Sequence, residues 1–307
     1  MTGGWKKIHP FPLFVYYSGV VLFSMLLLHP LYLVTGALYM SLFWILTGRK
    51  HNALRTLRYY LLTGLAVALF NPLFSHRGAT ILFYMFDQPV TLESIVYGLF
   101  MMLSLLTVLF AFQSGQQVLT GDKMFYLFAW AAPRATLAVR MAMRFVPLLL
   151  DRWKRVAEAQ RTQGLSFGEG TWKQKAADGM KLVSLLLTWS LEEAIVTARS
   201  MRARGYGTGK RTSYPFYRMR RQDWTVLSGM IVTAIVICAG KYAGYGTLTV
   251  YPRLAPFSVS GLEWFVYTAY CVFLAIPLYV QGKEHLLWRC WKFKTSLSPT
   301  PMRNVKR

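Results

Sequence analysis

The stretch that decides the fold consists of residues 133–164, PRATLAVRMAMRFVPLLLDRWKRVAEAQRTQG, and residues 173–206, KQKAADGMKLVSLLLTWSLEEAIVTARSMRARGY. In both parts apolar residues recur every three or four positions, which is the spacing of one face of a helix. The first face comprises Leu137, Met141, Phe145, Leu148 and Val156, and the second comprises Met180, Val183, Leu187, Leu191, Ala194, Ala198 and Met201. Basic residues cover much of the remaining surface, and a glycine, Gly164 or Gly205, ends each part. The pattern predicts two long amphipathic helices, the first kinked at Pro147.

Apolar segments flank this stretch on both sides. Six of them are about 16 to 19 residues long, close to what a helix needs to cross a bilayer. They occupy residues 13–28, 31–46, 59–74, 94–112, 224–240 and 264–280. The connection 75–92 contains only a short apolar piece, so it is predicted to be a re-entrant or surface segment.

These segments predict an all-α membrane protein with about six transmembrane helices and a cytoplasmic pair of long amphipathic helices. Residues 1–112 would hold the first four transmembrane helices, and residues 113–222 the amphipathic pair. Residues 223–282 would hold the last two transmembrane helices, followed by a basic cytoplasmic tail at 283–307.

The charge distribution orients the chain. Its 35 Lys and Arg outnumber 12 Asp and Glu, giving a net charge of +23. If both termini, the loop 49–58 and residues 113–222 are cytoplasmic, only Arg77, Lys241 and Arg253 of the basic residues lie outside, as the positive-inside rule requires. The charge is then explained by membrane orientation and contact with anionic lipid, and nucleic acid is not expected as a partner.

The sequence lacks the residues that ion-driven transport, metal binding and a phosphate-binding loop would require. The interiors of the six apolar segments carry no Asp, Glu, Lys or Arg, which argues against an ion-driven carrier. The three cysteines form no CxxC and the five histidines are scattered, so no metal or other cofactor is expected. Residues 205–211, GYGTGKR, lack the first glycine and the Ser or Thr of a phosphate-binding loop. A membrane enzyme acting on lipid or isoprenoid phosphate, with the basic region binding phosphate, stays open as the alternative.

The ends of the two amphipathic helices resemble one family. The second helix ends in Ala203-Arg204-Gly205, and the first ends in Thr162-Gln163-Gly164, preceded by Arg161. The passages MAMRFVPLL at 141–149 and NPLF at 71–74 are also similar to that family. Together these passages resemble the transmembrane T component of energy-coupling factor (ECF) transporters, which take up vitamins and metals in prokaryotes.

The resemblance implies a non-catalytic subunit of the prokaryotic cell membrane. In that family two coupling helices end in Ala-Arg-Gly-type motifs, and each motif arginine docks on an acidic groove of an ATPase. The expected partners are two ATP-binding cassette ATPases, a substrate-binding membrane (S) component and the lipid bilayer. The ATPase-docking residues would be Ala203, Arg204, Gly205, Thr162, Gln163, Gly164 and Arg161.

The two docking ends are not equivalent. Gln163 stands where the family has arginine, and glutamine brings no charge to an acidic groove. We therefore expect Arg204 to contribute more than Gln163, with Arg161 as a possible substitute on a different helix face. Glu192 and Glu193 could pair with Arg155 or Arg199, or simply face solvent.

Overall fold

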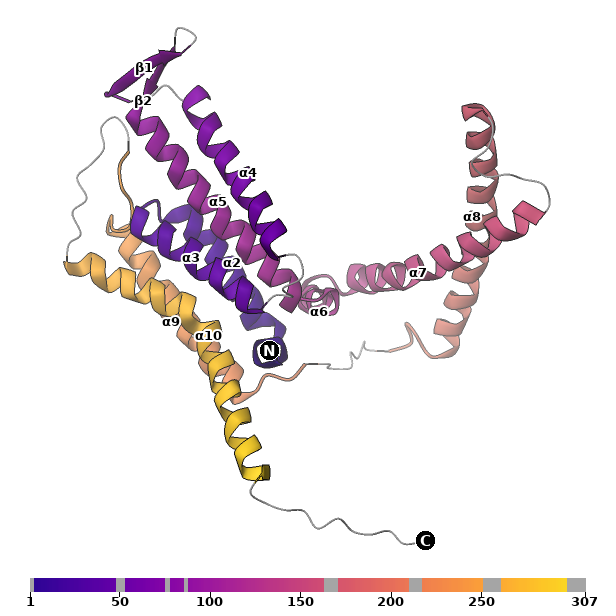
Figure 1. Cartoon of the computed structure of the whole chain (residues 1–307). Coiled ribbons are helices and arrows are strands. Elements are labelled where there is room, and N and C mark those ends of the chain that lie inside the picture. Colours follow the sequence, from indigo (N-terminus) through magenta and orange to yellow (C-terminus); the bar gives the residue numbers. More distant parts are fainter. Residues whose placement is uncertain are drawn as a thin grey trace. The chain divides into compact units, whose positions relative to one another are not determined.

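The fold of the chain is given by a computed structural model that describes residues 3–47, 53–74, 78–85, 88–162, 171–209, 217–250 and 261–296. It consists of two compact units (Figure 1). The first, here called the transmembrane unit, comprises Met1–Met124 and Tyr217–Arg307. The second, here called the α7–α8 unit, comprises Phe125–Phe216. The boundary between them falls within α6 (Gly121–Ala131).

The transmembrane unit is built almost entirely of helices. In chain order they are α1 (Gly3–Lys7), α2 (Pro10–Leu26), α3 (Pro30–Thr47), α4 (Ala53–Phe74), α5 (Leu92–Val118), α9 (Arg221–Tyr242) and α10 (Gly261–Ser296). Five of them are long and apolar enough to cross a membrane: α3, α4, α5, α9 and α10. The sixth predicted span corresponds to α2, which is apolar but has only 17 residues. The chain is therefore an all-α, multi-pass membrane protein, which confirms the predicted fold class.

Aromatic side chains and small residues bring these helices together. Tyr16 of α2 stacks on Phe273 of α10 with ring centroids 5.5 Å apart, and Phe23 meets the same ring edge-on at 5.2 Å. Between α4 and α5 the approach is closer still, because a Cβ on Gly98 would lie 2.7 Å from the backbone oxygen of Ala68. Small residues at such crossings let helix backbones pack closely inside a membrane.

The predicted surface segment 75–92 contains a feature that periodicity did not reveal. Strand β1 (Ile81–Met85) pairs with β2 (Gln88–Thr91) in an antiparallel hairpin, with Ile81 opposite Thr91. Glu93, at the start of α5, accepts hydrogen bonds from the Thr80 hydroxyl at 2.7 Å and the Thr80 backbone N–H. The carboxylate thus ties the base of the hairpin to the first turn of α5.

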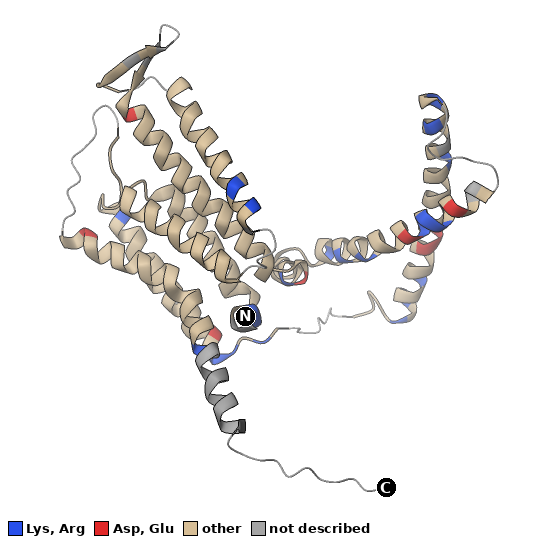
Figure 2. Ribbon diagram, in the orientation of Figure 1, with Lys and Arg blue, Asp and Glu red and all other residues tan. Residues whose placement is uncertain are grey.

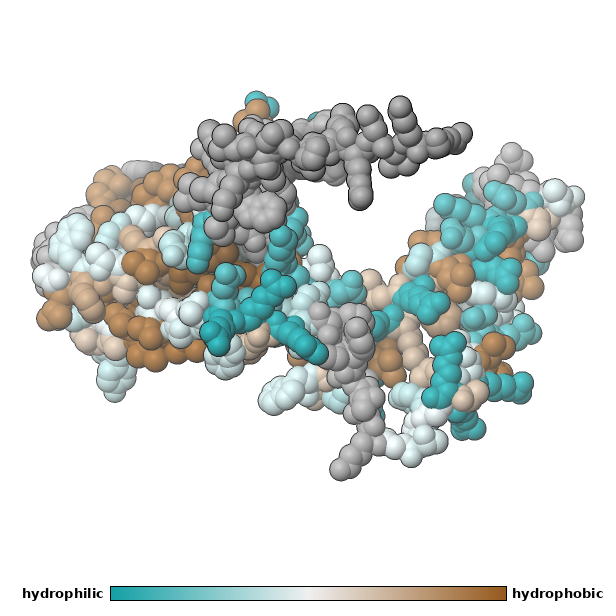
Figure 3. Space-filling model, turned by 90° about the horizontal axis from the view of Figure 1, so that it is seen from below, coloured by the Kyte–Doolittle hydropathy of each residue, from teal (hydrophilic) through white to brown (hydrophobic). Residues whose placement is uncertain are grey.

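Charged residues are distributed unequally. In Figure 2 the transmembrane helices are almost entirely tan, whereas blue gathers on α7 and α8. The space-filling view agrees, since brown hydrophobic surface covers much of the transmembrane unit, on the left (Figure 3). Where the spanning helices are charged, the residues lie near the ends of their apolar spans or beyond them, as Glu93, Asp223, Lys241 and Glu263 do. This is what a hydrocarbon surrounding requires.

Candidate functional site

The candidate site is the α7–α8 unit, and local sequence explains both of its long helices. Helix α7 (Pro133–Thr162) begins with a proline, whose missing N–H is tolerated in a first turn. Helix α8 (Trp172–Ala203) begins after a capping box, in which the Gln174 side chain accepts hydrogen bonds from the N–H and hydroxyl of Thr171. At 30 and 32 residues they are about 45 Å and 48 Å long.

The two helices meet through a cation–π contact. The guanidinium carbon of Arg152 on α7 lies 4.6 Å from the ring centroid of Trp189 on α8. Away from this contact, α8 leaves large apolar side chains uncovered. They are Met180, Leu187, Leu191 and Ile195, each more than half exposed. An apolar row of this length suits contact with another subunit or with lipid.

The C-terminal end of α8 has a defined geometry. Arg204 is the C-cap residue, and Gly205 follows with a φ of +81°. The N–H of Gly205 donates to the Arg202 carbonyl at 2.9 Å, and the N–H of Tyr206 donates to the Met201 carbonyl at 3.0 Å. This is the Schellman pattern, which needs a left-handed residue after the cap and therefore favours glycine. The Ala-Arg-Gly sequence thus ends the helix and leaves the Arg204 side chain exposed at its tip.

The corresponding end of α7 is described only in part. Thr162 is its last residue, and its hydroxyl donates to the Ala159 carbonyl at 2.6 Å. Arg161 belongs to the helix, but its side chain is outside the described residues, as are Gln163 and Gly164 entirely. The three expected docking residues of α8, Ala203, Arg204 and Gly205, therefore lie together at one helix end, whereas the α7 set stays a prediction.

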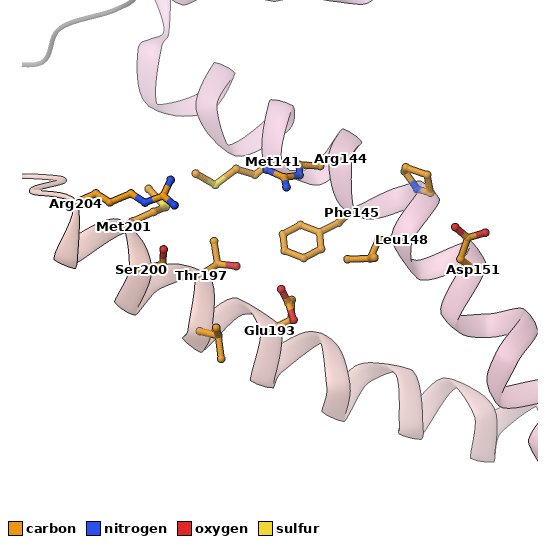
Figure 4. A pocket seen from close by; sticks show the side chains of 12 residues that line it. Met141, Arg144, Phe145, Leu148, Asp151, Glu193, Thr197, Ser200, Met201 and Arg204 are labelled. Carbon is orange, nitrogen blue, oxygen red and sulfur yellow. The ribbon is translucent and has the colours of Figure 1, made fainter.

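A crevice separates the facing sides of the two helices. It has a volume of about 700 Å³. Its apolar lining includes Phe145 and Leu148 of α7 and Val196 and Met201 of α8. Four charged residues also line it: Arg144 and Asp151 from α7, and Glu193 and Arg204 from α8 (Figure 4).

The charged groups of the crevice were not recognised as a set from the sequence. The sequence pattern places basic residues on the surface of both helices, and it leaves Glu193 either paired with Arg155 or Arg199 or facing solvent. Within the described residues Glu192 and Glu193 form no ion pair, and only Glu193 of the two lines the crevice. The sequence pattern of one helix cannot show which residue of the other helix lies opposite a given charged side chain.

Comparison with known proteins places this chain beside transporter subunits. It is 39% identical over 97 residues to the energy-coupling factor transporter transmembrane protein EcfT of Lacticaseibacillus paracasei. It is 33% identical over 102 residues to EcfT of Streptococcus equi and 34% identical over 110 residues to EcfT of Bacillus selenitireducens. The matched segments are 31%, 33% and 35% of this chain and span 37%, 36% and 41% of those relatives.

No protein-family model matches the chain. Several EcfT proteins nevertheless agree at 31–39% identity over about a third of its length. Together with the helices that can cross a membrane, these matches support similarity, over about a third of the chain, to EcfT, the transmembrane component of ECF transporters.

Proposed function

We propose that the chain is the non-catalytic coupling subunit of an ATP-driven ECF-type uptake transporter for a vitamin or a transition metal. It transmits movement from two ATP-binding cassette ATPase subunits to a substrate-binding membrane subunit. It lies in the plasma membrane of a prokaryote, with both termini and the α7–α8 unit in the cytoplasm. The EcfT-like matches and the combination of apolar spanning helices with two long basic helices support this role.

The observation that carries the proposal is the end of α8. Arg204 stands at the tip of a 32-residue helix, exposed and fixed in place by the Schellman hydrogen bonds of Gly205 and Tyr206. A guanidinium in this position can make two parallel hydrogen bonds to a carboxylate, and it keeps its charge when partly buried. A rigid helix that is gripped at its tip moves as a lever when the gripping subunit moves.

The apolar row of α8 supports a second contact. Its exposed side chains, such as Leu187, Leu191 and Ile195, would be covered by the substrate-binding membrane subunit. One surface of the lever would then face the membrane partner while its tip faces the ATPase. The alternative, an enzyme acting on lipid or isoprenoid phosphate, would use the same basic residues for phosphate and would need no ATPase.

Arg204→Ala tests the docking role. The chain is co-expressed with the two ATP-binding cassette subunits of its own genome, purified in mild detergent, and the retained ATPase is quantified against concentration. Loss of a charge-assisted hydrogen-bond pair costs about 1.5–3 kcal/mol, so affinity should fall by roughly ten- to a hundredfold. Gln163→Ala should cost clearly less, because glutamine brings no charge to the groove.

Arg199→Ala is the matched control, because Arg199 is an exposed arginine of the same helix that lies outside the crevice. It should retain the ATPases as the parent chain does. Equal losses for Arg204→Ala and Gln163→Ala would contradict the asymmetry. Full retention by Arg204→Ala would contradict the docking role, and turnover of a lipid phosphate by the purified chain alone would favour the enzyme.

A further inference from the structure

The crevice between α7 and α8 has an ordered arrangement of charge. In Figure 4 Arg204 lies toward one end and Asp151 toward the other, while Arg144 and Glu193 lie between them on facing walls. Arg204 is 11 residues after Glu193 on α8, a distance of about 16 Å along the helix. The crevice therefore has a basic end and an acidic end, with an apolar floor between them.

Among the residues that the structure describes, none forms an ion pair with any of the four charged residues, Arg144, Asp151, Glu193 and Arg204. Arg144, Asp151 and Arg204 are exposed, and Glu193 is half-buried. A crevice of about 700 Å³ can receive several side chains, and its apolar residues give an entering segment surface to cover. Its charges are available to whatever enters.

The charges decide what kind of occupant fits. A lipid chain or the apolar surface of a membrane subunit would bury all four charges without partners, at a large cost for each. An anionic headgroup would suit Arg144 and Arg204 but would be repelled by Asp151 and Glu193. A water-soluble protein segment carrying both an acidic and a basic side chain satisfies both ends.

We propose that the crevice receives a segment of one ATPase subunit that carries a carboxylate followed by a basic side chain. The carboxylate binds between Arg204 and Arg144, and the basic side chain binds Glu193 and Asp151. This inference rests on the proposed function, since it extends the contact at Arg204 inward along the groove between the helices. It makes Arg144 and Glu193 determinants of which ATPase is accepted and in which direction its segment lies.

The same residues could instead serve the chain itself. Arg144 and Glu193 lie on facing walls, so a closing of the two helices would let them pair with each other. The two arrangements differ in one respect that can be measured. An internal pair tolerates exchange of its two residues, whereas contacts to fixed charges on a partner do not.

The test measures binding of the two purified ATP-binding cassette subunits of the source genome to the full-length chain in lipid nanodiscs. The variants Arg144→Ala and Glu193→Gln should each weaken binding by about tenfold or more. Their matched controls, Arg155→Ala on α7 and Glu192→Gln on α8, change neighbouring exposed charges outside the crevice and should bind as the parent chain does. The exchanged double variant Arg144→Glu with Glu193→Arg should remain weak.

Two results would overturn the inference while leaving the proposed function intact. One is parent-like binding by Arg144→Ala and Glu193→Gln while Arg204→Ala binds weakly. The other is recovery of parent-like binding in the exchanged double variant, which would show that the two residues pair within the chain. Parent-like binding by all variants, Arg204→Ala included, would instead remove the proposed function itself.

Discussion

At the scale of single residues, His29 links stability to pH. It lies in the turn between α2 and α3, is only 3% exposed, and its Nε2 is 3.9 Å from a carboxylate oxygen of Glu263. Burial lowers the pKa of His29 below its ordinary value of 6.5, and the Glu263 charge opposes this only in part. The folded state then binds fewer protons than the unfolded state, so stability should be full above pH 6.5 and fall as the pH drops below it.

Thermal unfolding of the purified protein between pH 5 and pH 8 checks this prediction. His29→Gln removes the titration, so the fall in Tm below pH 6.5 should be smaller than in the parent chain. His9 is a comparison rather than a neutral control, because burial lowers its pKa too, with Asp223 opposing. The double variant His9→Gln with His29→Gln should therefore show the smallest change of Tm between pH 5 and pH 8. A parent-like slope in His29→Gln would contradict the assignment.

The sequence alone did not reveal this pair. The histidines are scattered along the sequence, and His29 falls between the predicted segments 13–28 and 31–46. Its partner is 234 positions further along the chain, at the first turn of α10. Long-range pairs of this kind arise from packing between helices, and no local periodicity records them.

At the scale of helices, the packing of α4 on α5 depends on one small residue. Asn71 of α4 donates to the Ser94 carbonyl of α5 at 2.9 Å, and nearby a Cβ on Gly98 would meet the Ala68 carbonyl oxygen at 2.7 Å. Because that atom is backbone, the helices must separate to accept a methyl group. Gly98→Ala should therefore destabilise the transmembrane unit by about 1–3 kcal/mol.

A helix glycine with free space provides the control. Gly229 of α9 has nothing within 4 Å of the position of an added Cβ. Gly229→Ala should leave the melting temperature unchanged or raise it slightly, because alanine is the better helix former. Equal effects of the two substitutions in thermal unfolding would show that the close approach of α4 and α5 contributes little.

The helices themselves were largely predictable, because apolar length and a spacing of three to four residues are local signals. The amphipathic pair and the apolar segments appear in the structure close to their expected ranges. The β1–β2 hairpin was missed, since its stability depends on strand pairing and on the Glu93–Thr80 contact. The crevice was missed for a similar reason: its charged residues come from two helices whose relative rotation is set by packing.

At the scale of the whole molecule, helix α5 fixes which parts of the chain face opposite sides of the membrane. Its 27 residues extend about 40 Å, more than the hydrocarbon thickness of about 30 Å. The β1–β2 hairpin comes directly before it, and α6 follows two residues after it. A single crossing would therefore separate the hairpin from the chain that leads into α7. From the excess of Lys and Arg in α7 and α8, the positive-inside rule predicts that these two helices lie on the cytoplasmic side.

Cysteine labelling of intact cells checks this topology in a chain whose three native cysteines are replaced by serine. Tyr84→Cys, at an exposed position of β1, should react with a membrane-impermeant maleimide added outside. Lys175→Cys, at an exposed position of α8, should react only after the cells are permeabilised. Labelling of both positions from the same side would contradict a spanning α5. The reverse result, with only Lys175→Cys reacting in intact cells, would place the basic helices outside, where Arg204 could not meet a cytoplasmic ATPase.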